Sequence, residues 1–467
     1  MFSNTVIYFA LLVLFQVALR ICFYHPEAPI WDAATYVSMG KYIFSAGQIG
    51  FIEPARPLLW PLLLGWFWKC GVDPMVIGLV LELIFSMGVL ILTYMIGVIA
   101  FDKKTAFIAS LLLGLSPVFF FWGSTQLTDI PASFFNLLAV LLFLQGVPLF
   151  AGMAAGLAIN TKFVHVLLPL FLFFWYLAVS KKSGRIRQAC GFAVGFAVVA
   201  ALFLLAALFL YGDALRAVTD GKLVYSYHQY SFVEGVWRSF DIFFKTEGWW
   251  YAFFFVAGVW GILRSAMKEK ALLVLCLTGV MFSWIPLLAT EVSRFSLAGL
   301  PFFYLIATRG MLVFAEWATR LVRWMGIVLF VLLLWFVVIQ VQRDCTMNCD
   351  IKLSDFQVFA AKNMPLLKGK KIWVSHPATL VYTDLKVEEL IYYGQIVPKI
   401  TRLHEADIVF FDSRDVNCYQ ADLICIDNRK KFAQRLKEGF IPFFSYGDPA
   451  DIFGGIFYRD PKTLKKH

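Results

Sequence analysis

Long apolar runs separated by short polar segments fill the chain as far as residue 342. A helix that crosses a bilayer needs about 20 mostly apolar residues, and the pattern predicts about eleven such spans. The run at 148–160 is short, which favours one half of a broken or tilted hairpin. The expected spans are 5–24, 76–100, 105–122, 130–146, 148–160, 163–180, 189–211, 249–264, 271–290, 297–315 and 325–342.

Residues 25–75 separate the first two expected spans and form a long loop. Its stretch Pro57–Trp68 is apolar but too short to cross a bilayer, and its tryptophans suit the headgroup boundary. We therefore expect an amphipathic helix on the membrane surface there, and a second short helix over Thr35–Ala46. Another long loop, 212–248, is rich in aromatic residues.

The pattern changes after about residue 343 to short apolar runs between turn residues. The runs "KKIWVS", "ADIVFFD", "LICID" and "GGIFYRD" predict strands, and "RKKFAQRLKEGF" predicts an amphipathic helix that ends at Gly439. The sequence thus predicts an all-α polytopic membrane domain over 1–342 and a small α/β domain over 343–467.

Composition supports a membrane protein. The chain is 60% hydrophobic and only 15% charged, whereas soluble domains average about 45–50% and 25%. The net charge of +10 does not indicate nucleic acid as a partner, because the cations fall in short loops and at helix ends.

The same cations predict the orientation. They are densest in "FDKK", "KKSGRIRQ", "RSAMKEK" and the segment 309–323. The positive-inside rule therefore places the N-terminus in the cytoplasm of a multi-pass cell-membrane protein, and an odd number of spans places 343–467 outside. Cys345, Cys349, Cys418 and Cys425 lack standard zinc spacing, so one or two disulfides are expected, with their pairing open.

Ionisable residues gather on the predicted outer side, just after spans. They are Asp32, Asp129, Lys162, Glu291 and Arg294. Ionisable groups at membrane depth are costly and tend to mark substrate sites. Carboxylates and cations at one interface can supply a base and bind an anionic group.

Structural roles remain open for each of these residues. Asp32 and Asp129 suit helix N-caps, because Asp accepts hydrogen bonds from the first amides of a helix. Lys162 suits an interfacial lysine whose stem lies along apolar surface. Arg56 before Pro57 suits a headgroup anchor, and His228 suits a packed loop histidine.

The order of several motifs resembles a known family. They are "WDAATYVSMGKYI" and "RPLLWPLLL" in the first loop, then "LSPVFFFWGSTQLTDIPASFF" and "GLAINTKF". The chain is similar to C-type glycosyltransferases (GT-C fold), nearest the group of protein O-mannosyltransferases and lipid A aminoarabinose transferases. The resemblance implies an inverting transfer of a sugar from a polyprenyl-phosphate-linked donor to a hydroxyl of a protein, lipid or glycan, on the outer face.

The resemblance also implies residue roles. Asp32 in the catalytic loop 25–75 is the acid/base candidate. Asp129 matches the aspartate of a "TDxP" motif and is the second catalytic candidate, placed to orient the acceptor or the base, or to ligate a metal. Arg56 stands where relatives contact the lipid phosphate, and Lys162 matches a recurring "TK" position. A second acidic residue often follows the first in the family, but Ala33 stands here, which counts against paired carboxylates holding a metal in this loop.

This assignment agrees with the chemistry of sugar transfer. A carboxylate can take the acceptor's proton, and cations stabilise charge on the departing phosphate. Arg294 joins Arg56 and Lys162 as a phosphate-binding candidate, and His228, Glu291 and Tyr36 are candidates for substrate contacts. No cofactor is implied, and a divalent metal is left open.

Three other functions are weighed. An outer-leaflet oligosaccharide ligase or phosphotransferase would cluster carboxylates around a metal. A transporter would carry charges near span centres and show repeat symmetry. A non-catalytic scaffold that displays the C-terminal domain would not need polar residues at one face.

Overall fold

The computed structural model describes residues 2–23, 30–179, 184–217, 219–220, 232–264, 268–283, 293–321, 351–391, 396–416, 418 and 423–459. The chain divides into two compact units. The first, here the helical unit, comprises Met1–Pro26, Ala55–Leu59 and Gly78–Met347. The second, the mixed unit, comprises Glu27–Pro54, Trp60–Ile77 and Asn348–His467.

The helical unit is built from helices of varied length. Their bounds are α1 Phe2–Phe23, α4 Pro74–Ala100 (its first turn in the mixed unit), α5 Lys103–Gly114, α6 Pro117–Trp122, α7 Asp129–Leu144, α8 Pro148–Thr161, η1 Phe163–Val166, α9 Leu167–Val179, α10 Arg185–Tyr211, α12 Phe232–Glu247, α13 Trp250–Arg264, α14 Lys268–Phe282, η2 Ser293–Ser296 and α16 Leu300–Leu321.

Two described helices, α4 and α10, are long and apolar enough to cross a membrane, and several shorter helices are also apolar. On α10, Val198, Leu202 and Leu205 expose 49%, 62% and 61% of their surface, and Phe209 exposes 91%. An apolar stripe of this length would be unfavourable in water. It suits a lipid-facing surface, as expected for a multi-pass membrane protein.

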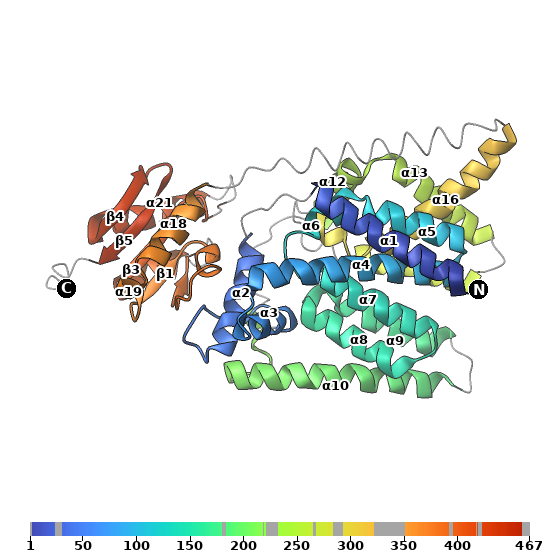
Figure 1. Ribbon diagram of the computed structural model, residues 1–467, viewed down its shortest axis with the longest axis horizontal. Coiled ribbons are helices and arrows are strands. Elements are labelled where there is room, and N and C mark those ends of the chain that lie inside the picture. Colours follow the sequence, from blue (N-terminus) through green and yellow to red (C-terminus); the bar gives the residue numbers. More distant parts are fainter. Residues whose placement is uncertain are drawn as a thin grey trace. The chain divides into compact units, whose positions relative to one another are not determined.

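Small residues allow close packing inside the helical unit. Helix α8 buries Ala151, Ala155 and Ala158 and lies beside α7 and α10, with α9 packed against the same group (Figure 1). Small side chains let helix backbones approach closely where lipid removes the hydrophobic drive for association. A second group forms from α5, α13, α14 and α16.

The predicted spans up to residue 315 coincide with helices, while residues 284–290 and the last span, 325–342, lie outside the described residues. The number of helices that cross the bilayer stays a prediction. The expected single span 105–122 is instead two helices, α5 and α6. Ser116 caps α6 by accepting from the Phe119 amide, and Pro117 at its first position cannot donate a hydrogen bond to the preceding turn.

The mixed unit combines two helices of the first loop with the C-terminal domain. Its elements are α2 Trp31–Phe44, α3 Leu59–Lys69 (Leu59 itself belonging to the helical unit), α18 Ile351–Lys362, α19 Met364–Leu367, β1 Ile372–Val374, η3 Pro377–Leu380, β2 Glu389–Leu390, α20 Ile396–Arg402, η5 Leu403–Glu405, β3 Ile408–Asp412, α21 Leu423–Gly439, β4 Phe440–Gly447 and β5 Phe453–Arg459.

The five strands form one sheet in the order β2-β1-β3-β5-β4. Strands β1, β2 and β3 are parallel, while β5 runs antiparallel to both β3 and β4. The predicted strands "KKIWVS", "ADIVFFD" and "GGIFYRD" are found as β1, β3 and β5. The prediction for "LICID" was wrong, because these residues begin α21, where a short apolar run continues into the helical pattern that follows.

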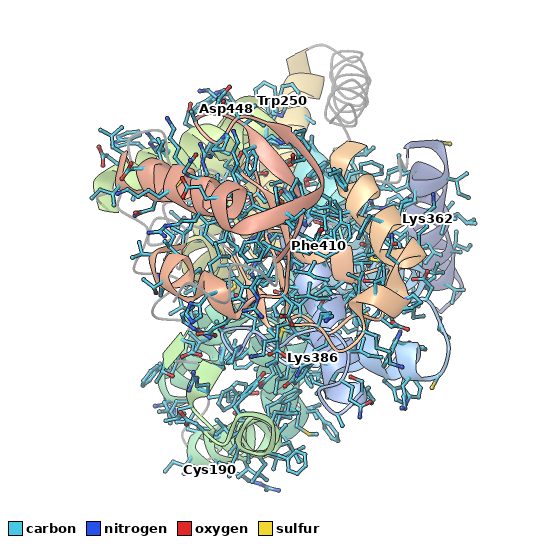
Figure 2. All side chains as sticks on the ribbon, turned by 90° about the vertical axis from the view of Figure 1, so that its left-hand side faces the viewer. Cys190, Trp250, Lys362, Lys386, Phe410 and Asp448 are labelled. Carbon is cyan, nitrogen blue, oxygen red and sulfur yellow. A yellow bond between two sulfur atoms is a disulfide. The ribbon has the colours of Figure 1, made fainter. Side chains whose placement is uncertain are left out.

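Both faces of the sheet are buried at β3, as its continuous apolar run predicts. Val409 and Phe411 face a core that α20 and α21 cover through Ile396 and Phe432. Ile408 and Phe410, the latter labelled in Figure 2, face the opposite core. That second core takes Phe356 from α18 and also Phe51 from the first loop.

The first loop is therefore an integral part of the mixed unit. Gly50 exchanges backbone hydrogen bonds with the chain of the C-terminal domain, donating to Leu385 O at 2.7 Å and accepting from Val387 N at 3.0 Å. Its φ of +78° and the closeness of Ser38 O leave no room for a Cβ. Loop and domain, far apart in sequence, thus fold together.

The buried ammonium of Lys41 on α2 joins the same two parts. Its Nζ donates to Leu380 O at 3.2 Å, Val381 O at 2.9 Å and Thr383 O at 3.1 Å. It also lies 3.1 Å from Asp384 Oδ1. These oxygens surround the C-terminal end of η3, where helix carbonyls lack partners of their own.

Candidate active site

Asp129 and Lys162 form a buried ion pair in the helical unit. Only 5% of the Asp129 side chain and 14% of the Lys162 side chain are exposed. Asp129 begins α7, whose N-cap is Thr128, and no side-chain cap hydrogen bond is formed there. The Asp129 carboxylate therefore serves Lys162 rather than capping a helix, and Lys162 is not an interfacial lysine extended into solvent.

Lys162 of this ion pair and a second cation, Arg294, lie over the same aromatic ring. The Lys162 ammonium is 4.6 Å and the Arg294 guanidinium 5.0 Å from the centre of the Phe295 ring. Arg294 also lies 5.9 Å from the ring of Trp122, whose Nε1 donates to Ser293 Oγ at 3.1 Å. The structure thus brings together Asp129, Lys162 and Arg294, three of the residues predicted from the sequence.

An apolar cavity of about 320 Å³ adjoins the turn that carries Arg294. Ser293 and Ser296 of η2 line it together with phenylalanines of α12, α13, α14 and α16. The turn η2 therefore contributes Ser293 and Ser296 to the cavity lining, and it carries Phe295, over whose ring Lys162 and Arg294 lie. A small set of polar groups at the edge of an apolar cavity is the usual build of a ligand site.

Sequence reasoning missed several buried polar residues of the helical unit. Glu82 of α4 is 1% exposed and lies within electrostatic range of Arg20 and Asp129. Arg20 donates to Phe120 O at 2.7 Å. Glu82 stands inside an apolar run, and a single carboxylate in such a run was the signal that could have found it.

Three more buried hydrogen bonds of the helical unit involve residues that the sequence reasoning did not single out. His165 of η1, three residues after Lys162, is hydrogen-bonded to the side chain of Asn136 on α7. Glu247, at the end of α12, accepts from Ser116 Oγ at 2.6 Å and from the Tyr304 hydroxyl at 2.5 Å. The amphipathic pattern of residues 232–247, within the loop expected at 212–248, was the signal for α12.

Asp32 belongs to the mixed unit, in the first turn of α2. That helix begins at Trp31 rather than at Thr35 as expected, so Asp32 lies within it and does not cap it; the N-cap is Ile30. Tyr36, four residues on, is buried with 5% exposure. Arg56 is half-buried in the bend before α3, in the helical unit.

The remaining predicted residues, His228 and Glu291, lie outside the described residues. Within the part of the chain that the structure describes, no group of three or more His, Cys, Asp or Glu side chains could hold a metal ion. The described part of the C-terminal domain has a disulfide between Cys418 and Cys425, with a Cα–Cα distance of 5.6 Å.

Comparison with known proteins gives one family and a consistent fold. Residues 55–211 match the model of the family described as dolichyl-phosphate-mannose-protein mannosyltransferase. The search of curated proteins gave no match. The matched segment includes Arg56, Glu82, Asp129 and Lys162.

Solved structures match nearly the whole chain. The Archaeoglobus fulgidus oligosaccharyltransferase tethered with an acceptor peptide has a TM-score of 0.64 at 12% identity, covering 99% of this chain and 75% of that chain. The same organism's enzyme AglB, in complex with an inhibitory peptide and a dolichol-phosphate, has a TM-score of 0.64 at 11% identity, covering 98% and 74%. ArnT from Cupriavidus metallidurans, bound to undecaprenyl phosphate, has a TM-score of 0.60 at 12% identity, covering 88% and 93%. The solved structures show that the fold is shared, and together with the family match they confirm the resemblance that the motifs indicated.

Proposed function

We propose that this chain is a membrane glycosyltransferase that moves a sugar from a polyprenyl-phosphate-linked donor to an acceptor hydroxyl. The observation that carries the proposal is the pair of cations over Phe295 beside an apolar cavity. A polyprenyl phosphate has a charged head and an apolar tail. The two cations suit the phosphate, and the cavity suits apolar atoms of the donor.

The proposed reaction is a single displacement. The acceptor oxygen bonds to the anomeric carbon while the bond from that carbon to the phosphate oxygen breaks. The hydroxyl proton passes to the carboxylate of Asp32, and the bonding electron pair leaves with the polyprenyl phosphate. Attack opposite the departing phosphate inverts the configuration at the anomeric carbon.

Lys162, Arg294 and Asp129 have proposed roles that their surroundings support. Lys162 acts as a point charge on the leaving oxygen, while the planar guanidinium of Arg294 can hold two phosphate oxygens. Arg56 supplies a third cation. Asp129 holds Lys162 in place until phosphate binds, since an ammonium with a buried carboxylate partner has one preferred position.

We also infer that the N-terminus is cytoplasmic and that the C-terminal domain lies outside. The disulfide Cys418–Cys425 supports this, because disulfides persist in oxidising compartments. An oligosaccharyltransferase activity is the second candidate, since the archaeal enzymes share the fold over 99% of this chain. Transfer of single sugars and of oligosaccharides from the same lipid would separate the two.

Donor binding tests the phosphate assignment. Lys162→Met and Arg294→Met should each weaken binding of undecaprenyl phosphate to the purified protein about 10–100-fold, because charge-assisted hydrogen bonds contribute roughly 1.5–3 kcal/mol. Binding of the uncharged prenol should not change. Lys245→Met on α12, where the lysine is 67% exposed, is the matched control.

A second variant tests the cavity. Gly279 lines it, and a Cβ there would meet no atom within 4 Å, so the side chain of Gly279→Leu begins in open space and narrows the cavity. This variant should weaken binding of both undecaprenyl phosphate and the prenol. Unchanged affinity in both cation variants would remove the phosphate assignment, and unchanged prenol binding in Gly279→Leu would remove the cavity from the donor site.

A further inference from the structure

A cluster of polar side chains lies at one edge of the sheet in the mixed unit. Strand β1 lies between β2 and β3 in the sheet. After β1 the chain forms β2 on one side of it and then β3 on the opposite side. In such sheets, ligands bind beyond the carboxyl ends of the strands at this switch point. The residues found there, here called the sheet-edge cluster, are Ser375, His376, Asp412, Arg414, Asp415 and Tyr446.

Hydrogen bonds connect most of the cluster across three strands. Ser375 donates to Asp415 Oδ2 at 2.7 Å and accepts from the Asp412 amide at 2.9 Å. Asp412 accepts from Arg414 Nη2 at 2.5 Å and from the Tyr446 hydroxyl. Only 5% of the Asp412 side chain is exposed, while a third of Arg414 is. The buried carboxylate thus holds the guanidinium and the phenol at the edge.

The backbone is shaped for this arrangement. Asp412 and Tyr446 both pair with Gly454 of β5, which lies between them. A Cβ at position 454 would lie 2.3 Å from the Tyr446 hydroxyl, so the glycine lets the phenol cross β5 to reach Asp412. A bulkier residue at 454 would break the Tyr446–Asp412 contact.

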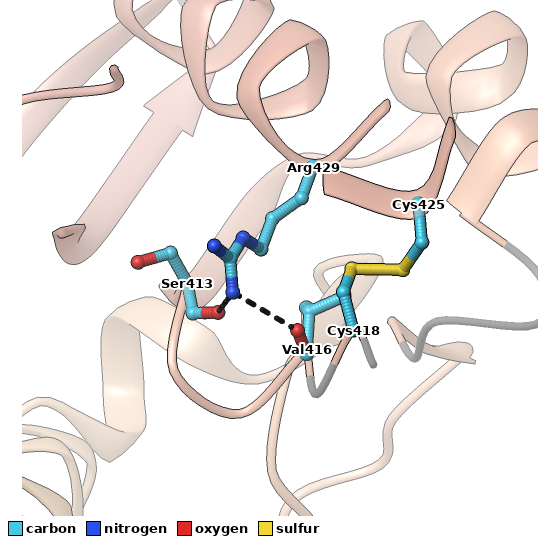
Figure 3. The surroundings of a disulfide bond; sticks show 5 residues. All are labelled: Ser413, Val416, Cys418, Cys425 and Arg429. Atoms are coloured by element: carbon cyan, nitrogen blue, oxygen red, sulfur yellow. Dashed lines mark hydrogen bonds between the residues drawn. A yellow bond between two sulfur atoms is a disulfide. The ribbon is translucent and has the colours of Figure 1, made fainter. Parts of the chain in front are cut away.

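The loop that carries Arg414 and Asp415 is anchored to helix α21. Arg429 of α21 donates to Ser413 O at 3.2 Å and to Val416 O at 3.4 Å (Figure 3). The disulfide between Cys418 and Cys425 ties the same loop to the start of α21 (Figure 3). A site whose groups are fixed before a ligand arrives binds with a smaller loss of conformational entropy.

The same edge adjoins the helix that carries the proposed base. The ring of Trp31, at the start of α2, lies 5.2 Å from the ring of His376, which follows β1. Asp32 is the next residue of α2. A ligand at the His376 end of the sheet-edge cluster would therefore lie close to the N-terminal turn of α2.

The chemistry of the cluster indicates what it would bind. Its partly exposed groups include the Asp415 carboxylate, which accepts, and the Arg414 guanidinium, which donates, and together these match hydroxyl groups that do both. The cluster contains two carboxylates, Asp412 and Asp415, and one guanidinium, and this excess of negative charge disfavours phosphate and other anions. We propose that the sheet-edge cluster binds a neutral, hydroxyl-rich part of the acceptor, a sugar residue, beside the helix that carries Asp32. The identification of this ligand as the acceptor rests on the proposed function.

Binding of glycans to the full-length protein, without donor, tests the proposal. The probe is an array of neutral oligosaccharides, their phosphorylated and sulfated counterparts, and peptides that contain Ser and Thr. Neutral glycans should be retained, and Arg414→Met and Tyr446→Phe should each lower their apparent affinity about tenfold or more. Arg435→Met, an exposed arginine on the outer side of α21, should change nothing.

The outcomes separate this proposal from the proposed function. No retention of neutral glycans, retention of peptides or anionic glycans alone, or equal retention by the edge variants would each overturn the proposal. Tyr446→Phe removes a single oxygen, so it keeps the test valid should Arg414→Met fail to fold. The assay contains no donor, so a failed phosphate assignment would leave its result untouched.

Discussion

Replacing Lys41 with Met should loosen the helix that carries Asp32. The side chain keeps its length and apolar stem but loses its ammonium, so the carbonyls of Leu380, Val381 and Thr383 lose a donor. Each of these three hydrogen bonds contributes about 1 kcal/mol net, so the docking of α2 should lose roughly 3 kcal/mol of stability.

The ion pair itself adds little to this figure. Burial lowers the pKa of Lys41 and Asp384 raises it, so the two effects on the charged form oppose each other. Asp384 is 54% exposed, and its carboxylate stays solvated once Lys41 is gone. The expected loss therefore comes from the carbonyls at the end of η3.

Hydrogen exchange measures this loss directly. Opening of α2 that becomes easier by about 3 kcal/mol should speed amide exchange over residues 31–44 roughly a hundredfold, while β3 exchanges as before. Lys69→Met, an exposed lysine at the end of α3, is the control. Unchanged exchange in α2 of Lys41→Met would refute the reasoning that the C-terminal domain holds this helix.

Three other results are expected. Reduction of Cys418–Cys425, or Cys418→Ser with Cys425→Ser, should raise proteolytic cleavage within 413–425 and leave α18 protected; equal cleavage would contradict the anchoring role. Burial alone would raise the pKa of Asp412, but hydrogen bonds from Arg414 and Tyr446 lower it below its usual 3.8. The contribution of Asp412 to stability is thus present above pH 3.8 and is lost as pH falls through the lowered pKa. Acid unfolding of Tyr446→Phe, measured by near-UV circular dichroism, should therefore begin at higher pH than that of the wild type. An unshifted onset would contradict this. Reporter fusions after Lys104 and Arg187 should read cytoplasmic, and fusions after Ser124 and at the C-terminus external; a cytoplasmic C-terminus would contradict the odd number of spans.

Most helices of the helical unit were predictable because they depend on a local property, a long apolar run. Helix α12 was missed because its amphipathic period lies in an aromatic-rich segment read as a loop. The strand predicted at "LICID" was wrong for a related reason, since a short run of apolar residues suits a strand or the start of a helix equally.

The site was only partly predictable. Asp129, Lys162 and Arg294 follow apolar runs in the sequence; in the structure Asp129 pairs with Lys162, and Lys162 and Arg294 lie over the ring of Phe295. Glu82 was missed because its environment depends on Arg20, which lies on another helix. The docking of the first loop on the C-terminal domain was beyond sequence reasoning, because the partners of Lys41 lie more than 300 residues away.

Comparing the Asn variants of Asp129 and Asp32 tests which aspartate takes the proton. Asp129→Asn removes the charge that holds Lys162 but leaves a hydrogen-bonding amide. We expect a smaller loss of transfer than for Asp32→Asn. A greater loss than for Asp32→Asn would contradict the assignment of the proton transfer to Asp32 and of a positioning role to Asp129.

Single-turnover transfer by Asp32→Asn is the most direct test of the central claim. The substrate is a labelled polyprenyl-phosphate sugar, and binding of the same donor is measured alongside. The amide keeps the shape of the side chain and removes the proton acceptor. A positioned general base contributes roughly 10²–10⁴-fold, so transfer should fall by that factor while donor affinity is unchanged. Transfer at the wild-type rate would contradict the assignment of Asp32 as the base.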